Sequence, residues 1–232
     1  MMHSKRLVAV ACAVLSSASF AVLAQEETSS PISWEIGAVS DYVFRGASQT
    51  DENPTGQAGI TYTAPFGLYV GTWASGVDFG DGDPDFEVDY FVGYGFDIGD
   101  SVNFDVMLNR YTYPGASELN YNELITTTSF AENYSLTVAY SNDVWASDTD
   151  GWYYGIGGEW GLPNDFSLSA SIGRSTFDSG VAEDYTDWGV GVSKSFGIVS
   201  VGLNYYGTDS KGDTNFGKLA DDRVVLSVKV SQ

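Results

Sequence analysis

The sequence has one cysteine and one histidine, and both lie near its start, at Cys12 and His3. We expect that part of the chain to be removed on export, so the remaining protein carries no thiol and no imidazole. Their absence excludes a disulfide scaffold, the usual Ser-His-Asp and Cys-His nucleophile arrangements, and zinc or iron sites with His or Cys ligands. We expect no cofactor.

Basic residues are also few. Without Lys5 and Arg6, which belong to the same N-terminal part, the ten basic side chains fall to eight against 31 acidic ones, a formal net charge of −23. Nucleic-acid binding requires a basic patch, so nucleic acid is excluded as a partner. Aromatic residues make up 15% of the chain, which favours an ordered protein over a disordered acidic one.

Long apolar runs are missing too. No segment after the start approaches the roughly 18 continuous apolar residues of a transmembrane helix. Catalysis by paired carboxylates, as in glycoside hydrolysis, is the one enzymatic chemistry that the composition leaves open. Because 31 acidic residues produce chance pairs in any fold, that signal is weak, and we predict that the protein is not an enzyme.

The first residues have the three parts of a secretory signal peptide. A basic pair precedes the apolar run Leu7–Leu15, and small residues precede a cleavage site after Ala24. We predict that residues 1–24 are cleaved and that residues 25–232 form one domain. The alternative is a lipoprotein modified at Cys12, which would leave a very short apolar core before that residue.

The rest of the sequence alternates polar and apolar residues with a period of two, which indicates strands with two unlike faces. The clearest case is DFEVDYFVGYGFD, where Glu87 and Asp89 belong to the polar face. In the first segment, Tyr42 and Phe44 continue the apolar face. The two faces of the segment at 120–130 are poorly separated. We predict twelve strands, at 32–44, 55–64, 66–75, 85–97, 100–113, 120–130, 132–142, 151–161, 165–176, 185–196, 198–207 and 222–232.

The connections between these segments alternate in length. Short turns lie around Ala64, Gly99, Ala131, Pro163 and Gly197, whereas connections such as RGASQTDENP and GTDSKGDTNFGKLADD are longer and polar. Short turns at one end and long loops at the other are typical of an outer-membrane barrel with both termini in the periplasm. We therefore predict an all-β protein, a closed antiparallel transmembrane β-barrel in the outer membrane of a Gram-negative bacterium.

A water-soluble periplasmic barrel that binds a small ligand is the alternative, because the same strands could turn their apolar faces inward. Two features favour the membrane barrel. The polar faces are rich in Gly and Ser, which suits a lumen, and aromatic residues gather near strand ends, where membrane girdles lie. These aromatics are Tyr42, Phe44, Trp73, Tyr111, Trp145, Trp152, Trp160, Phe166, Trp188 and Phe196.

The segments SDYVFRGASQTDENPTGQAGITY, at residues 40–62, and GLYVGTWAS, at residues 67–75, resemble a known family. This is the proteobacterial Gcw_chp family of exported proteins, also described as TorF-family porins. The similarity is sharp over residues 37–79 and diffuse but continuous to the C-terminus. The resemblance implies an exported barrel with a porin-like function, and it carries over no catalytic or ligand residues.

Charged residues on the polar faces are the candidates for lining the lumen. Acidic ones predominate, and acidic rings favour cations. Arg45 either pairs with a carboxylate inside the barrel or lines a constriction. The candidates are Glu35, Asp41, Arg45, Glu87, Asp89, Asp105, Glu159 and Lys229.

These residues predict a porin that passes small hydrophilic solutes, preferentially cationic ones. The alternative is a structural or adhesive barrel with a plugged lumen. Barrels of about eight strands are filled by side chains and those of about 16–18 hold water, so twelve strands leave both interpretations open.

Two arginines fall on the apolar face instead. Arg110 and Arg174 continue apolar alternations toward the predicted outer end of their strands, where each could contact a lipopolysaccharide phosphate. We therefore expect outer-membrane lipid and lipopolysaccharide as partners, together with the barrel assembly machinery. The chain ends in Val-Ser-Gln rather than an aromatic residue, so its recognition by that machinery departs from the general habit of barrels.

An acidic loop precedes the fourth predicted strand. Its carboxylates suggest a calcium site, because hard cations take oxygen ligands. Their spacing differs from that of an EF-hand, and we favour a solvated loop without a metal. The weak metal-ligand candidates are Asp78, Asp81, Asp83 and Asp85.

Overall fold

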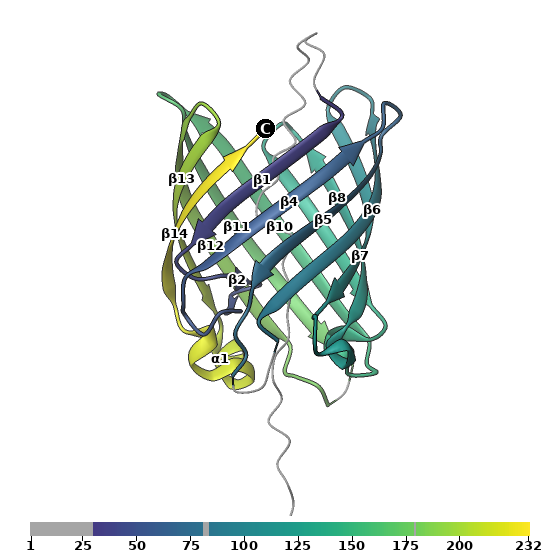
Figure 1. Ribbon diagram of the computed structural model, residues 1–232, viewed down its shortest axis with the longest axis vertical. Coiled ribbons are helices and arrows are strands. Elements are labelled where there is room, and N and C mark those ends of the chain that lie inside the picture. The colour runs from purple at the N-terminus through teal and green to yellow at the C-terminus, as the bar shows by residue number, and fades with distance from the viewer. Residues whose placement is uncertain (1–29, 81–83, 179) are drawn as a thin grey trace, which may run out of the picture.

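A computed structural model describes residues 30–80, 84–178 and 180–232, and twelve long strands in it close into one antiparallel barrel. Figure 1 shows the strands tilted around a common axis. They are β1 (Ile32–Val39), β4 (Thr55–Thr63), β5 (Leu68–Gly76), β6 (Phe86–Ile98), β7 (Val102–Thr112), β8 (Tyr121–Phe130), β9 (Tyr134–Ser141), β10 (Gly151–Leu162), β11 (Phe166–Phe177), β12 (Tyr185–Phe196), β13 (Val199–Thr208) and β14 (Arg223–Ser231).

Each strand pairs with its neighbours in sequence, and β1 pairs with β14 to close the barrel. The predicted fold class and the number of strands are confirmed. The bounds of the strands agree closely with the predicted segments except at the first one. There β1 ends at Val39, five residues before the predicted end, and the chain leaves the barrel wall.

The two ends of the barrel differ in their connections. Short connections, such as 64–67 and 163–165, lie at one end, which we call the turn end, and Figure 1 places the C-terminus there. The opposite, loop end carries the long connections. It includes the helix α1 (Ser210–Phe216) and the short 3-10 helices η1 (Ser117–Leu119), η2 (Val144–Ala146) and η3 (Gly217–Ala220).

The outer face of the barrel is apolar along the whole wall. Ile36 is 59% exposed, Val190 51% and Leu226 50%, and large exposed apolar residues occur on every one of the twelve strands. A surface of this kind requires lipid rather than water around it. The alternative of a water-soluble barrel is therefore wrong, because it places these side chains inside. None of the described helices is long and apolar enough to cross a membrane.

The inner face alternates with the outer one and is polar, and it is most tightly packed toward the loop end. Glu87, Asp89, Asn109 and Tyr111 are fully buried there. Inward residues closer to the turn end, such as Asp105, are only half-buried. The lumen is therefore filled at its loop end and more accessible at its turn end.

Four of the aromatics predicted for a membrane girdle lie inside the barrel instead. Tyr42, Phe44, Trp73 and Tyr111 are buried at 8% exposure or less, and Tyr42 and Trp73 pack edge-to-face at 5.4 Å. Tyr42 and Phe44 are buried because the segment after β1 folds into the lumen, whereas Trp73 and Tyr111 occupy inward-facing positions of β5 and β7. Trp152, Phe166 and Phe196 do face outward near strand ends.

Candidate constriction site in the barrel lumen

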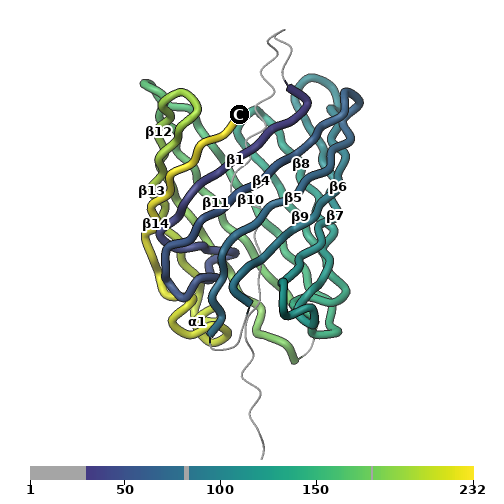
Figure 2. Tube along the Cα trace, in the orientation of Figure 1, coloured from purple at the N-terminus to yellow at the C-terminus, as the bar shows by residue number. Residues whose placement is uncertain are grey.

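A short hairpin enters the lumen from the loop end. After Val39 the chain turns inward, and β2 (Val43–Phe44) pairs with β3 (Ala47–Ser48). Residues 41–50, which we call the inner hairpin, are mostly buried, with Gln49 at 0% exposure. Figure 2 shows this part of the trace inside the outline of the barrel near the loop end. The inner hairpin therefore narrows the lumen.

The tip of the inner hairpin is a two-residue turn, Arg45-Gly46, with positive φ at both residues (45° and 81°). Such turns have φ above zero at both central positions, where glycine is favoured. A Cβ on Gly46 would also meet Thr208 at 2.3 Å. The turn thus fits against the inner wall only with glycine at this position, and it fixes the direction of the Arg45 side chain.

Arg45 forms a buried ion pair with the barrel wall. Its Nη2 donates to both carboxylate oxygens of Glu123 on β8, at 2.9 and 3.0 Å, and the two side chains are 9% and 2% exposed. The guanidinium also lies over the ring of Tyr153 at 4.1 Å. Burial acts to lower the pKa of Arg45, but the attraction of Glu123 raises it above its ordinary value, so the arginine stays charged.

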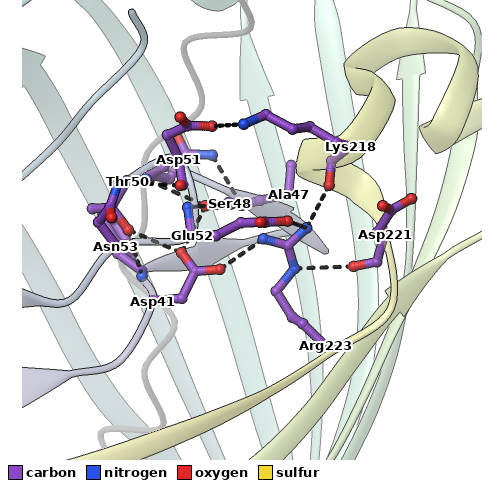
Figure 3. Close-up of polar contacts among 12 residues, drawn as sticks. Asp41, Ala47, Ser48, Thr50, Asp51, Glu52, Asn53, Lys218, Asp221 and Arg223 are labelled. Atoms are coloured by element: carbon purple, nitrogen blue, oxygen red, sulfur yellow. Dashed lines mark hydrogen bonds and ion pairs between the residues drawn. The ribbon is translucent and has the colours of Figure 1, made fainter.

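A second ion pair holds the base of the inner hairpin. Asp41 accepts from Nη1 of Arg223, at the start of β14, at 2.7 Å. Figure 3 shows that Arg223 also donates to the carbonyls of Lys218 and Asp221, at 2.9 and 3.0 Å. Arg223 therefore ties the inner hairpin to the last long loop, which carries α1 and η3.

Within the inner hairpin, Ser48 and Thr50 donate to the other oxygen of Asp41, at 2.6 and 2.9 Å. These bonds and the pair with Arg223 occupy both oxygens of the carboxylate. Ala47 packs in a cluster with Tyr185, Phe216 and Ala220, so α1 and η3 cover the inner hairpin from the loop end.

Acidic side chains surround the tip of the inner hairpin. Glu87 accepts from the hydroxyls of Tyr42 and Tyr113, at 3.2 and 3.0 Å. Asp187 on β12 accepts from Tyr153 at 3.3 Å, and Asp89 is fully buried. Together with Glu123, four acidic side chains of the wall lie in the narrow part of the lumen, where Arg45 is the basic residue at the tip of the hairpin.

Fewer partners hold the lumen side chains toward the turn end. Glu35 pairs with Lys229 at 3.0 Å, with the two side chains about one-third exposed (30% and 33%). Asp105 accepts from Tyr69 at 2.9 Å, and Glu159 is half-buried. These residues lie on strands at the positions that the alternation predicts.

Asp41 and Arg45 lie elsewhere than predicted. The predicted first strand, 32–44, includes Asp41 and continues in phase to Arg45, but β1 ends at Val39, and both residues reach the lumen on the inner hairpin instead. Sequence reasoning also missed three residues of the constriction, namely Glu123, Asp187 and Arg223. Asp187 and Arg223 lie within the predicted segments 185–196 and 222–232, on the polar face of each, so the alternation alone could have identified them. The poorly separated faces of β8 hid Glu123.

The two arginines of the outer face lie near the loop end of their strands. Arg110 donates to Asn122 at 3.3 Å, and Arg174 donates to Thr186 at 3.1 Å. Arg174 also lies 3.6 Å from Asp209 and 3.7 Å from Asp184. Protein carboxylates are thus already near Arg174, and contact with lipopolysaccharide stays a prediction for both arginines.

The acidic loop offers no metal centre within the described part of the chain. Asp78 and Asp85 are exposed, while Asp81 and Asp83 lie outside the described residues, as does the predicted signal peptide. Among residues 30–80, 84–178 and 180–232, no group of three or more Asp, Glu, His or Cys is arranged to hold a metal ion.

Solved porin structures share this fold at low sequence identity. The NanC porin superposes with a TM-score of 0.59 and 10% identity, over 86% of this chain and 98% of that one. The KdgM porin superposes with a TM-score of 0.55 and 8% identity, over 86% and 97% of the two chains. No curated protein sequence matches this chain. A family profile does match, over residues 24–231, and the chain belongs to this family, Gcw_chp, which is described as bacterial proteins of unknown function.

Proposed function

We propose that the protein is a porin-like channel of the Gram-negative outer membrane, with its turn end in the periplasm and its loop end outside the cell. The observation that carries the proposal is a closed barrel with an apolar outer face and an acidic lumen, narrowed by a hairpin whose tip is Arg45. The channel passes small hydrophilic solutes. In this proposal the lumen carboxylates have no catalytic role. Arg110 and Arg174 meet outer-leaflet phosphates at the membrane surface.

One observation favours a second candidate, a structural barrel with a permanently plugged lumen. Gln49 of the inner hairpin and Asn109 and Tyr111 of the wall are each 0% exposed, so the narrow part is densely packed. The channel proposal requires that a path for ions runs past the inner hairpin, or that the inner hairpin moves to open one. Conductance of the folded protein in a planar bilayer distinguishes the two candidates, since the structural barrel gives none.

The proposed outer-membrane location predicts how the protein fractionates and how it migrates on a detergent gel. The mature protein is expected in the outer-membrane fraction, and it should migrate faster on a detergent gel before boiling than after boiling, because closed barrels resist detergent until heated. Cell fractionation with gel migration of both samples is the measurement. Recovery of the mature protein in the soluble periplasmic fraction would contradict the proposed location.

The lumen charges predict cation selectivity. Reversal potentials in a potassium chloride gradient should show preference for potassium, because carboxylates outnumber basic groups along the lumen. The preference should weaken at 1 M salt, where screening shortens to about 3 Å. Asp105→Asn, in the more accessible part of the lumen, should reduce it, whereas Glu132→Gln in an exposed turn is the matched control. Preference for chloride in the wild type would contradict the prediction.

A further inference from the structure

One carboxylate of the constriction has no partner of its own. Asp89, on β6, is 0% exposed, and within the described residues no hydrogen-bond donor reaches either of its carboxylate oxygens. A buried carboxylate without a compensating charge or hydrogen bond destabilises the folded state. The folded state is therefore stabilised by whatever neutralises Asp89, either a bound cation or a proton.

The neighbouring carboxylates already have partners. Glu87 accepts from Tyr42 and Tyr113, and Glu123 is held by Arg45 and by Tyr111, whose hydroxyl lies at 3.0 Å. Asp89 experiences the negative charges of both. The positive charge of Arg45 is therefore engaged by Glu123 and does not compensate Asp89.

An amide next to Asp89 is also left without partners. Asn109, on β7, faces the lumen diagonally across from Asp89 and directly opposite Glu123 in the register of β7 and β8. It is 0% exposed, and its Oδ1 and Nδ2 make no hydrogen bond within the part of the chain that the structure describes. Its amide lies near the Asp89 carboxylate, but no hydrogen bond of normal geometry joins the two. Two adjacent side chains thus offer three oxygens to a ligand.

We propose that Asp89 and Asn109 bind an alkali cation, sodium or potassium, at the constriction. Oxygen ligands suit hard cations, and a single positive charge compensates the single carboxylate of Asp89. A divalent ion fits less well, because no group of three or more acidic residues is arranged around a metal within the described ranges. The site identifies alkali cations as a solute class for the proposed channel. It rests on the proposed function only because the ion would reach Asp89 through the lumen.

The test measures folding stability and uses no conductance, so its failure is distinguishable from failure of the channel proposal. Folded mature protein is heated in detergent in sodium, potassium or choline chloride at equal ionic strength, and the midpoint for loss of the fast-migrating gel form is recorded. We expect the midpoint in sodium or potassium chloride to exceed that in choline chloride by about 2–4 °C, the shift for roughly 1 kcal/mol of linked binding in a chain of this size.

Two variants locate the effect. Asp89→Asn should abolish the difference between the salts, and Asp105→Asn, whose carboxylate already accepts from Tyr69, should retain it. Equal midpoints of the wild type in the three salts would overturn the proposal, and they are the result expected if a proton neutralises Asp89. Retention of the full difference in Asp89→Asn would overturn it as well, because the cation would then bind elsewhere.

Discussion

Replacement of Arg45 by alanine is expected to reduce the free energy of unfolding of the barrel by about 3–5 kcal/mol, since the substitution leaves Glu123 buried without its counter-charge. Glu123 is 2% exposed, and within the described residues the Tyr111 hydroxyl would remain as its side-chain hydrogen-bond donor. The substitution also removes the stacking of the guanidinium on Tyr153. Equilibrium unfolding in denaturant, with detergent or lipid present, is the measurement.

A second variant separates the charge from the packing. Arg45→Ala combined with Glu123→Gln removes both charges, so it should be more stable than the sum of the two single effects predicts, by about 1–3 kcal/mol. Lys229→Ala is the matched control, because its partner Glu35 is about one-third exposed and such pairs contribute about 0–1 kcal/mol. An Arg45→Ala variant no less stable than Lys229→Ala would show that the buried pair does not hold the inner hairpin.

The barrel could be predicted from the sequence because each strand is indicated by the alternation of its own residues. Alternation in DFEVDYFVGYGFD or in residues 165–176 reports the two faces of a strand without reference to any other segment. The lengths of the connections then distinguished the turn end of the barrel from the loop end. Even β8, whose faces separate poorly, was identified, because its neighbours on both sides fixed its limits.

The inner hairpin could not be predicted in this way. Tyr42 and Phe44 continue the alternation of β1, so the local pattern is the same whether residues 41–44 extend the wall or enter the lumen. The outcome depends on pairing, since the register of β1 with β4 ends at Val39 opposite Thr55. The pair of Arg45 with Glu123 joins positions 78 residues apart, and no periodic pattern reports such a contact.

Removal of the inner hairpin is expected to have the largest effect on function, a several-fold rise in single-channel conductance. The register suggests how to remove it. Because Val39 and Thr55 are paired across β1 and β4, residues 40–54 can be replaced by Asn-Gly, which favours a two-residue hairpin turn. Glu87 and Glu123 would then lose Tyr42 and Arg45 and become hydrated, so cation preference should rise together with conductance.

A matched variant controls for the change in chain length. A flexible Gly-Ser segment of the same length in place of residues 40–54 keeps the connection but removes the two ion pairs at Arg45 and Asp41. It should give a conductance above that of the wild type with larger fluctuations, because the segment is no longer fixed to the wall. Migration of unboiled samples on a detergent gel verifies that both variants are folded.

Paired planar-bilayer recordings of the wild type and of the variant with Asn-Gly in place of residues 40–54 test the central claim most directly. The claim is that the inner hairpin constricts a cation-selective channel. It predicts small, discrete, cation-selective openings in the wild type and a several-fold larger unit conductance in the variant. Equal conductance of the two folded proteins, or no conductance in either, would contradict it.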